Sequence, residues 1–293
     1  MADRQLIDAL LSGPARSVVG LGEGARGGSG VVIDDGRVLT LARNLRGEGV
    51  AVRFRDGRSE SATLLGTDAE LGVAALAVPT ADSPAAAWSE DTAAPAIGSG
   101  VFAMADPAGH GLRVTAGAVT SAPRSLRGPR GRMLEGLIEH TAPLPRGSGG
   151  GPLLDEAGRL LGINAVRLAH GFILALPGAR VRARLADLTA GRSRTPTRLG
   201  VAVVPPRIAR RLRRAVGLPE LDGVLVRAVE PGSAADRAGV QRGDLIVALD
   251  GRVVDSLDAL FGALDAVPLA QPVPLGIVRG VEERDVQVSL EPT

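Results

Sequence analysis

The densest concentration of residues suited to chemistry is the glycine-rich segment Arg146–Leu154, which contains Ser148 among four glycines. Glycines this dense allow left-handed backbone and a close approach of amide N–H groups, which is the arrangement that binds anions. A serine hydroxyl becomes a nucleophile only where a base takes its proton and another group orients that base. The segment therefore indicates an anion-binding loop, and catalysis at Ser148 needs a base from elsewhere in the chain.

The chain offers few bases and few metal ligands. It contains three His and no Cys or Tyr, and none of the His lies in a ligand-spaced pair such as H-E-x-x-H. The absence of Cys excludes thiol catalysis, Cys-ligated metals and a disulfide framework. We therefore expect no metal and no cofactor. His140 is the nearest His to the loop in sequence, and we interpret it as a wall residue of the entering strand.

The elements that must position this loop are predominantly short strands. At roughly 150 residues per domain, 293 residues predict two domains. Brief β-branched or Leu-rich runs separated by Gly, Asp and Pro predict a sandwich or barrel up to about residue 177. Helices are predicted at 4–12 and 178–188, and the loop at 189–197 is the best linker. Strands then alternate with helices near 207–216 and 257–266, which indicates an α+β module.

The glycine-rich segment resembles G-N-S-G-G-P-L-L, the nucleophile loop of chymotrypsin-like proteases, particularly of the HtrA/DegP family. Further motifs similar to that family follow in its order along the chain. They are Gly28–Ile33, Val38–Thr40, Gly66–Asp68, Val73–Leu76, Asp106–Gly109, Val114–Ala122, Gly162–Ala165 and Gly171–Pro177. The resemblance implies a chymotrypsin-like (HtrA-type) double β-barrel over residues 17–188, preceded by an N-terminal helix within residues 1–16.

The same resemblance places the family's base, acid and nucleophile at Arg43, Gly72 and Gly149. A guanidinium stays protonated far above neutral pH and cannot act as the base. We therefore expect a pseudoprotease, not an enzyme. The remnant oxyanion loop, Gly147, Ser148 and Gly149, would accept a peptide carbonyl or carboxylate, or merely preserve the turn. The alternative is a serine endopeptidase of the protein quality control type that uses a displaced nucleophile such as Ser148.

The region from residue 198 to residue 293 resembles a PDZ domain, most closely over Pro231–Ile246 and at the turn Asp250–Gly251. Such a domain binds an extended C-terminal peptide as an added strand. The resemblance implies a carboxylate-binding loop and an apolar pocket formed by Leu199, Gly200, Val201, Leu257 and Phe261. The predicted fold is thus mostly β, a chymotrypsin-like double β-barrel followed by an α+β PDZ domain, with residues 189–197 as the linker.

These observations predict an HtrA-like homologue that binds peptides or protein C-termini with an apolar last residue, as an adaptor, scaffold or chaperone. All 34 basic residues are Arg, yet the formal charge is only +2, which argues against a strongly positive surface. The Arg-rich helix at 207–216 is interpreted as a solvated face, so we expect neither nucleic acid nor a membrane as partner. The sequence leaves open whether the chain forms a homo-oligomer. Residues 1–13 carry no long apolar run, so we expect no signal peptide and a cytoplasmic location.

Overall fold

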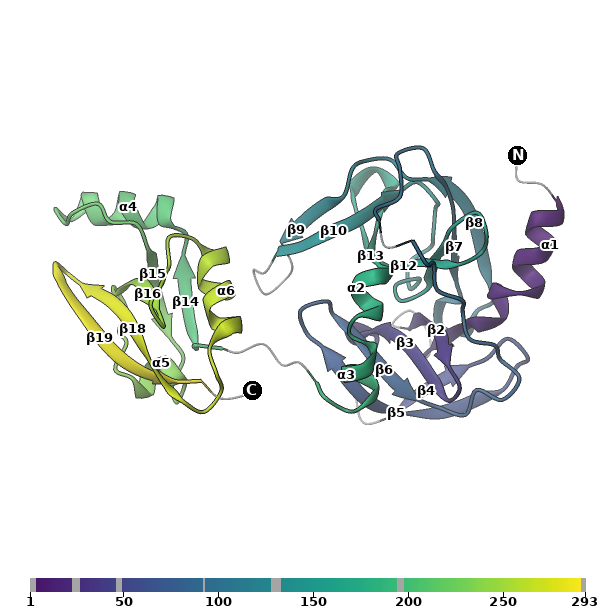
Figure 1. Cartoon of the computed structure of the whole chain (residues 1–293), viewed down its shortest axis with the longest axis horizontal. Coiled ribbons are helices and arrows are strands. Elements are labelled where there is room, and N and C mark those ends of the chain that lie inside the picture. Colours follow the sequence, from purple (N-terminus) through teal and green to yellow (C-terminus); the bar gives the residue numbers. More distant parts are fainter. Residues whose placement is uncertain are drawn as a thin grey trace. The chain divides into compact units, whose positions relative to one another are not determined.

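The structure is a computed structural model that describes residues 4–22, 27–45, 49–91, 93–127, 133–193 and 198–290. It divides into two compact units (Figure 1). Unit 1 comprises residues 1–126 and 134–194, and unit 2 comprises residues 127–133 and 195–293. The predicted limits of the N-terminal helical segment, 1–16, and of the linker, 189–197, stay predictions.

The first half of unit 1 is a closed barrel in the strand order β1-β2-β3-β6-β5-β4. Its strands are β1 (Val18–Leu21), β2 (Gly28–Asp34), β3 (Arg37–Leu41), β4 (Val50–Arg53), β5 (Ser59–Asp68) and β6 (Val73–Ala77), and helix α1 (Arg4–Ser12) precedes them. Four successive residues of β3, from Val38 to Leu41, are buried. Burial on both faces explains the continuous apolar run of this strand, because one face fills the barrel and the other packs against neighbouring structure.

The second half of unit 1 is a seven-stranded sheet in the order β8-β7-β11-β12-β13-β10-β9. Its strands are β7 (Gly100–Ala105), β8 (Arg113–Ala118), β9 (Arg124–Arg127), β10 (Met133–His140), β11 (Pro152–Leu154), β12 (Leu160–Arg167) and β13 (Ile173–Pro177). The single helix expected at 178–188 is two helices, α2 (Gly178–Arg182) and α3 (Leu185–Thr189). They separate because α2 packs against β12 and β13, whereas α3 packs against β5 and β6 of the first barrel.

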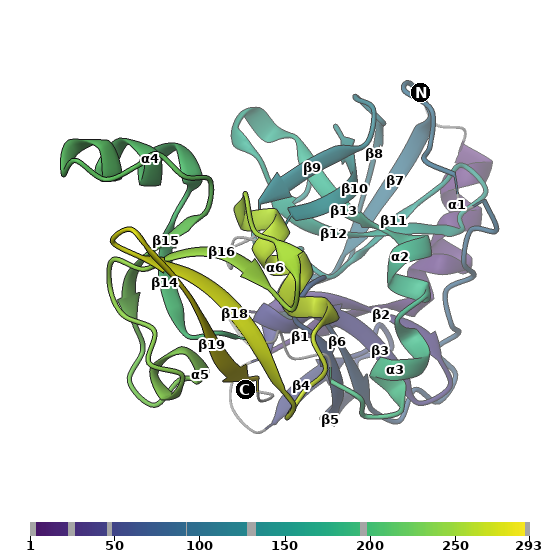
Figure 2. The same ribbon diagram turned by 60° about the vertical axis from the view of Figure 1, so that its left-hand side comes forward.

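Unit 2 is an antiparallel sheet in the order β14-β15-β16-β18-β19, with β17 paired to β16. Its strands are β14 (Val201–Val204), β15 (Val224–Val229), β16 (Leu245–Leu249), β17 (Arg252–Val253), β18 (Pro272–Arg279) and β19 (Glu282–Ser289). Its helices are α4 (Pro206–Ala215), α5 (Ala234–Arg237) and α6 (Leu257–Ala266). Helix α4 packs against β15 and α6 against β16 (Figure 2). The mostly β fold predicted from the strand-like runs is confirmed.

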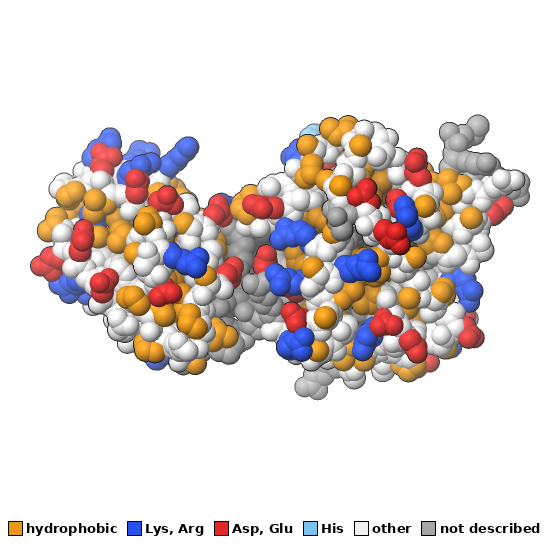
Figure 3. Space-filling model, in the orientation of Figure 1, with side chains coloured by type: hydrophobic (Ala, Val, Ile, Leu, Met, Phe, Trp, Pro, Cys, Tyr) orange, Lys and Arg blue, Asp and Glu red, His pale blue; other side chains and the backbone are white. Residues whose placement is uncertain are grey.

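Charged side chains of both signs lie interspersed on the face shown in Figure 3, as the near-balanced charge predicts. The Arg-rich helix α4 departs from its predicted solvated face at one position. Arg213 is 2% exposed, and its guanidinium donates to the carbonyl oxygens of Pro219 and Gly280. Its aliphatic stem and planar head thus fix the helix to the sheet. Across the described ranges, no helix is long and apolar enough to cross a membrane.

Candidate functional site

The glycine-rich loop lies between β10 and β11 and is fixed to both halves of unit 1. The carbonyl oxygen of Gly149 accepts hydrogen bonds from the Ser29 N–H at 3.0 Å and from Asn44 Nδ2 at 2.8 Å. The Gly150 N–H donates to the carbonyl oxygen of Asn164 at 2.8 Å. Gly150 has φ +95°, and a Cβ there would lie 2.1 Å from the Ser29 carbonyl oxygen. Only glycine fits this position, so the sequence motif preserves the path of the loop.

The structure brings together the three positions at which the resemblance places a triad. Arg43 lies in the short 3₁₀ segment η3 (Ala42–Asn44), and the Ala42 N–H donates to the carbonyl oxygen of Gly72 at 2.8 Å. A Cβ at Gly149 would lie 2.6 Å from Arg43 Nη2. The Arg43 guanidinium therefore reaches the space that a side chain at position 149 would enter.

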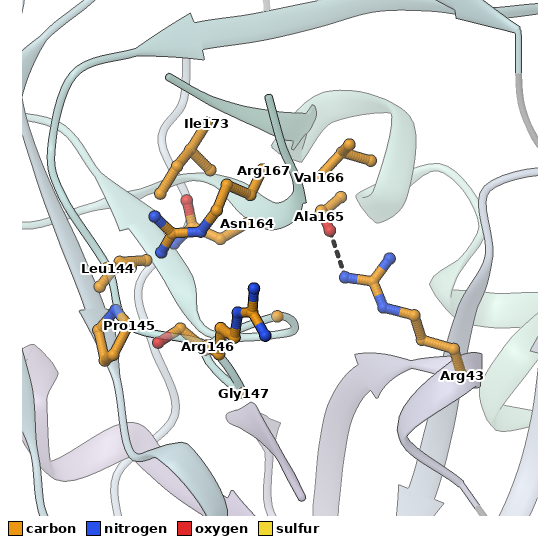
Figure 4. A pocket seen from close by; sticks show the side chains of 12 residues that line it. Arg43, Leu144, Pro145, Arg146, Gly147, Asn164, Ala165, Val166, Arg167 and Ile173 are labelled. Carbon is orange, nitrogen blue, oxygen red and sulfur yellow. Dashed lines mark hydrogen bonds between the residues drawn. The ribbon is translucent and has the colours of Figure 1, made fainter. Parts of the chain in front are cut away.

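Arg43 spans the gap between the first barrel and the wall formed by β12. Its Nη2 donates a hydrogen bond to the carbonyl oxygen of Ala165, drawn as the dashed line in Figure 4. Partial burial lowers the pKa of Arg43 from its ordinary value, yet a guanidinium remains protonated at neutral pH. This side chain is a fixed positive charge and hydrogen-bond donor.

Gly72 ends a turn that is organised by a buried carboxylate. Asp68 Oδ1 accepts the N–H groups of Glu70 and Leu71, each at 2.9 Å, and Arg184 Nε lies 3.6 Å from its other oxygen. Gly72 itself has φ +71°, and a Cβ added there would meet no atom within 4 Å. The turn supplies a backbone carbonyl to Ala42 and presents no acidic side chain at position 72.

A pocket of about 300 Å³ opens beside Arg43 and the loop (Figure 4). Its lining residues are Arg43, Leu144, Pro145, Arg146, Gly147, Ser148, Gly149, Asn164, Ala165, Val166, Arg167 and Ile173. Ser148 is 4% exposed, and its Oγ is buried with no hydrogen-bond partner. Within the described chain, the N–H groups of Gly147 and Gly149 also have no acceptor. The pocket thus presents a hydroxyl and two amides that protein atoms leave unsatisfied.

His140 is buried next to this pocket but does not line it. Its Nε2 lies 2.9 Å from Asn164 Oδ1, and its Nδ1 has no partner. Burial lowers the pKa of His140 from its ordinary value, partly offset by the hydrogen bond to Asn164, so the imidazole is neutral. The other two histidines, His110 and His170, are exposed. In the described part of the chain, no group of three His, Asp or Glu side chains is placed to hold a metal ion.

The predicted carboxylate-binding loop of unit 2 is held by its carbonyl groups. The carbonyl oxygens of Leu199 and Gly200 accept the N–H groups of Ala235 and Glu230, at 2.9 and 2.8 Å. Gly200 has φ +80°, and a Cβ there would lie 2.1 Å from Ser233 Cβ. The N–H groups of Leu199 and Gly200 have no acceptor among the residues that the structure describes. Two successive backbone donors are therefore available at this loop.

The loop leads directly into β14, which is an edge strand of its sheet. Val201 and Val203 of β14 and Leu257 and Phe261 of α6 are half-buried against the same apolar core. Leu199 differs from the prediction in one respect, because only 3% of it is exposed and its side chain belongs to that core. Its contribution at the surface is its backbone amide.

Comparison with known proteins separates the chain into the same two kinds of module. Residues 28–163 match the family of trypsin-like peptidase domains, and residues 225–279 match the family of PDZ domains. HhoA of Synechocystis sp. is 32% identical over 266 residues, which cover 86% of this chain and 67% of HhoA. The chain belongs to the HtrA/DegP family. Periplasmic serine endoprotease DegP of Escherichia coli is 28% identical over 272 residues, covering 90% of this chain and 56% of DegP.

Solved structures of the HtrA/DegP family share this fold. A serine endoprotease from Yersinia pestis is 21% identical, covers 100% of both chains and has a TM-score of 0.75. The HtrA-type protease AlgW with a decapeptide is 22% identical, covers 98% of both chains and has a TM-score of 0.77. The predicted chymotrypsin-like double barrel followed by a PDZ domain is thereby confirmed. The chain spans little more than half the length of DegP.

The names of the HtrA relatives correct two predictions. DegP and DegQ of Escherichia coli are serine endoproteases by name. These names contradict the prediction that the chain is not an enzyme. Both relatives are periplasmic by name, which likewise contradicts the predicted cytoplasmic location. The lack of a long apolar run in residues 1–13 carries no information about the compartment. Positions 43, 72 and 149 nevertheless carry Arg, Gly and Gly.

One pocket residue, Arg167, escaped the reasoning from the sequence, and Arg146 entered it only as the first residue of the glycine-rich segment. Arg146 immediately precedes the glycine-rich loop, and Arg167 ends β12, where it reaches the same opening as Arg43 (Figure 4). Their side chains converge although 21 residues separate them in sequence, because β10, β12 and β13 are neighbours in one sheet. Only the Arg next to the glycines gave a local signal.

Proposed function

We propose that this HtrA-family chain captures protein or peptide C-termini with an apolar last residue through its PDZ domain. The observation that carries the proposal is that the N–H groups of Leu199 and Gly200, where the edge strand β14 begins, have no acceptor among the described residues. A peptide that adds to this edge as a further strand would direct its carboxylate to the two amides. Such charge-assisted hydrogen bonds contribute about 1.5–3 kcal/mol.

The half-buried side chains of β14 and α6 support an apolar selectivity. Leu257 and Phe261 pack against the core on one side and are partly exposed on the other, as are Val201 and Val203. Burying a Val- or Leu-sized side chain against them would add about 1.5–3 kcal/mol. Among structural relatives, AlgW at 25% identity and a TM-score of 0.70 was solved with a tripeptide, which supports peptide binding by this architecture.

The proposal is tested by calorimetric titration of the full chain with a peptide ending in Val, as the free acid and as the C-terminal amide. We expect the amide to bind about tenfold or more weakly, because it loses the charge-assisted hydrogen bonds. Leu257→Glu should abolish binding of the free acid by placing a carboxylate at the site. Leu269→Glu is the matched control, because Leu269 is 48% exposed and lies outside α6. Equal affinity of acid and amide would refute the proposal.

Gly200 is unsuited to this test, although it lies in the carboxylate-binding loop. Its positive φ and the 2.1 Å approach of an added Cβ to Ser233 mean that any side chain there disturbs the loop itself. A loss of binding in Gly200→Glu would therefore report folding and not recognition. Substitutions at positions 257 and 269 replace an existing side chain on normal backbone and leave the loop itself unchanged.

We infer a second candidate function, hydrolysis of peptide bonds in the barrel domain with Ser148 as the nucleophile. The buried, unpartnered Ser148 Oγ in the pocket favours it, as do relatives named serine endoproteases. The base must be a group other than Arg43. The imidazole of His140 reaches the pocket wall through Asn164 and is neutral. Labelling of the chain by a fluorophosphonate probe, and degradation of unfolded casein, should both disappear in Ser148→Ala. Casein degradation that persists in Ser148→Ala would contradict this assignment.

A further inference from the structure

The pocket of unit 1 is lined by an excess of positive charge. Three of its twelve lining residues are arginines, Arg43, Arg146 and Arg167, and none is Asp or Glu. Figure 4 shows the three side chains around one opening, with Arg43 entering from the first barrel, Arg146 from the loop between β10 and β11, and Arg167 from the end of β12. Like charges placed this close repel one another, and an anion between them removes that repulsion.

These three guanidinium groups have no acidic partner among the described residues, whereas several other arginines of the chain do. Arg37, Arg58, Arg159 and Arg192, for example, pair with Asp34, Asp56, Asp155 and Asp187 at 2.7–3.0 Å. Over the described residues, the guanidinium groups of Arg146 and Arg167 form no hydrogen bond or ion pair, and that of Arg43 bonds only to the Ala165 carbonyl oxygen. The donors at the pocket are therefore free for a ligand.

Neutral donors converge on the same space. Ser148 is 4% exposed and its Oγ has no partner, which is uncommon for a buried hydroxyl. The N–H groups of Gly147 and Gly149 also have no acceptor in the described chain. These donors do not depend on the arginines, since they belong to the backbone and side chain of the loop. A ligand that satisfies these donors must carry hydrogen-bond acceptors.

We propose that this pocket binds the carboxylate of an acidic peptide, with Arg43, Arg146 and Arg167 as its cationic donors and Ser148 as a neutral donor. Arginine suits a carboxylate because its planar fork matches the two oxygens. The remaining side chains of the wall are apolar apart from Asn164, and Leu144 and Ile173 are each 4% exposed. That wall favours a carboxylate on a methylene stem, as in a glutamate side chain, over a free inorganic anion.

The test uses the full chain and acetylated, amidated pentapeptides that contain one central Glu or Gln among alanines. Because the peptide has no free C-terminus, the result is independent of the PDZ site. At low ionic strength we expect the Glu peptide to bind at least about tenfold more tightly than the Gln peptide. Arg146→Ala and Arg167→Ala should each weaken it about fivefold or more. Arg192→Ala is the matched control, since Arg192 is exposed and pairs with Asp187 on the surface.

Two further arms identify the source of the carboxylate. The first arm titrates an alanine peptide with a free C-terminus into the Leu257→Glu variant. Binding that is weakened by Arg146→Ala and Arg167→Ala would show that a terminal carboxylate also fills the pocket, which supports the proposal. Inorganic phosphate that competes at the concentration of the peptide would overturn the peptide assignment. Equal binding of the Glu and Gln peptides, or an equal loss in Arg192→Ala and Arg167→Ala, would overturn the proposal altogether.

Discussion

The loop Gly147–Gly149 of the barrel domain and the loop Leu199–Val201 of the PDZ domain present the same backbone device in different surroundings. Each offers two N–H groups that have no acceptor in the described chain, and each needs glycine at a left-handed or crowded position. Arginine side chains surround the first loop, whereas Val, Leu and Phe side chains surround the second. Under the two proposals, the backbone amides favour negatively charged oxygen at both loops, and the neighbouring side chains select the ligand that carries it.

The two loops also differ in how far their surroundings keep the residue types of the HtrA family. The PDZ loop retains Gly200, whose φ of +80° and contact with Ser233 leave no room for a side chain. In the barrel loop, the glycines that fix the backbone are retained, while positions 43, 72 and 149 carry Arg, Gly and Gly. The scaffold of the pocket is therefore separable from the chemistry of its side chains, which the following substitutions test.

The largest effect is expected for Gly150→Ala, because the added Cβ would lie 2.1 Å from the Ser29 carbonyl oxygen at a φ of +95°. The clash and the backbone strain together should lower the free energy of unfolding by about 3 kcal/mol or more. Gly72→Ala is the matched control, with φ +71° and open space, and should cost only about 1–2 kcal/mol. Urea unfolding of both variants measures the difference. Equal losses would show that the loop is not fixed by this contact.

Phe261→Ala should separate the two loops functionally. Removing a half-buried ring from α6 should weaken a peptide with a free C-terminal Val by about tenfold, in line with the loss of roughly 1.5 kcal/mol of apolar burial. Binding of the amidated Glu peptide to unit 1 should not change. Calorimetric titration with each peptide provides the measurement. A parallel loss for both peptides would mean that the two sites are not independent.

Much of this architecture was accessible from the sequence. Local signals predicted α1 and α6 at their observed bounds, because each has apolar residues at helical spacing. The split between α2 and α3 was missed, since it depends on which sheet each helix packs against. For the same reason, no local pattern showed that Arg43 would lie against Gly149, or that Arg146 and Arg167 would share its pocket. The order of the motifs located the site, and long-range packing determined which side chains line it.

The stability of the barrel domain should depend on the protonation of His140. Burial lowers the pKa of His140 below its ordinary value of 6.5, so the unfolded chain takes up a proton at a higher pH than the folded chain. The free energy of unfolding therefore falls as the pH drops below 6.5, by at most about 1.4 kcal/mol per pH unit, and His140 does not change it above that pH. Unfolding of His140→Gln should show a shallower slope over this range. The control His110→Gln, exposed in the wild type, should keep the full slope. Equal slopes for both variants would contradict the prediction.

The smallest effect is expected for the coupling between Arg43 and Gly149. A Cβ at position 149 would lie 2.6 Å from Arg43 Nη2, so Gly149→Ala should displace the guanidinium from the Ala165 carbonyl oxygen. In the Arg43→Ala background the same change meets no guanidinium and should cost about 0.5–1 kcal/mol less. A double-mutant cycle in urea measures this coupling. Gly72→Ala with Arg43→Ala serves as the control pair and should be additive, because position 72 faces open space. Additivity at 149 as well would contradict the contact.

If both proposals hold, the two loops bind two chemically distinct peptide groups independently of each other. The most direct measurement is a competition titration on the full chain. It uses the amidated Glu peptide and a peptide that ends in free Val and lacks acidic side chains. We expect saturation with either peptide to leave the affinity for the other unchanged, with one site for each. Displacement of the Glu peptide by the Val peptide at the affinity of the latter would show a single shared site and would contradict the claim.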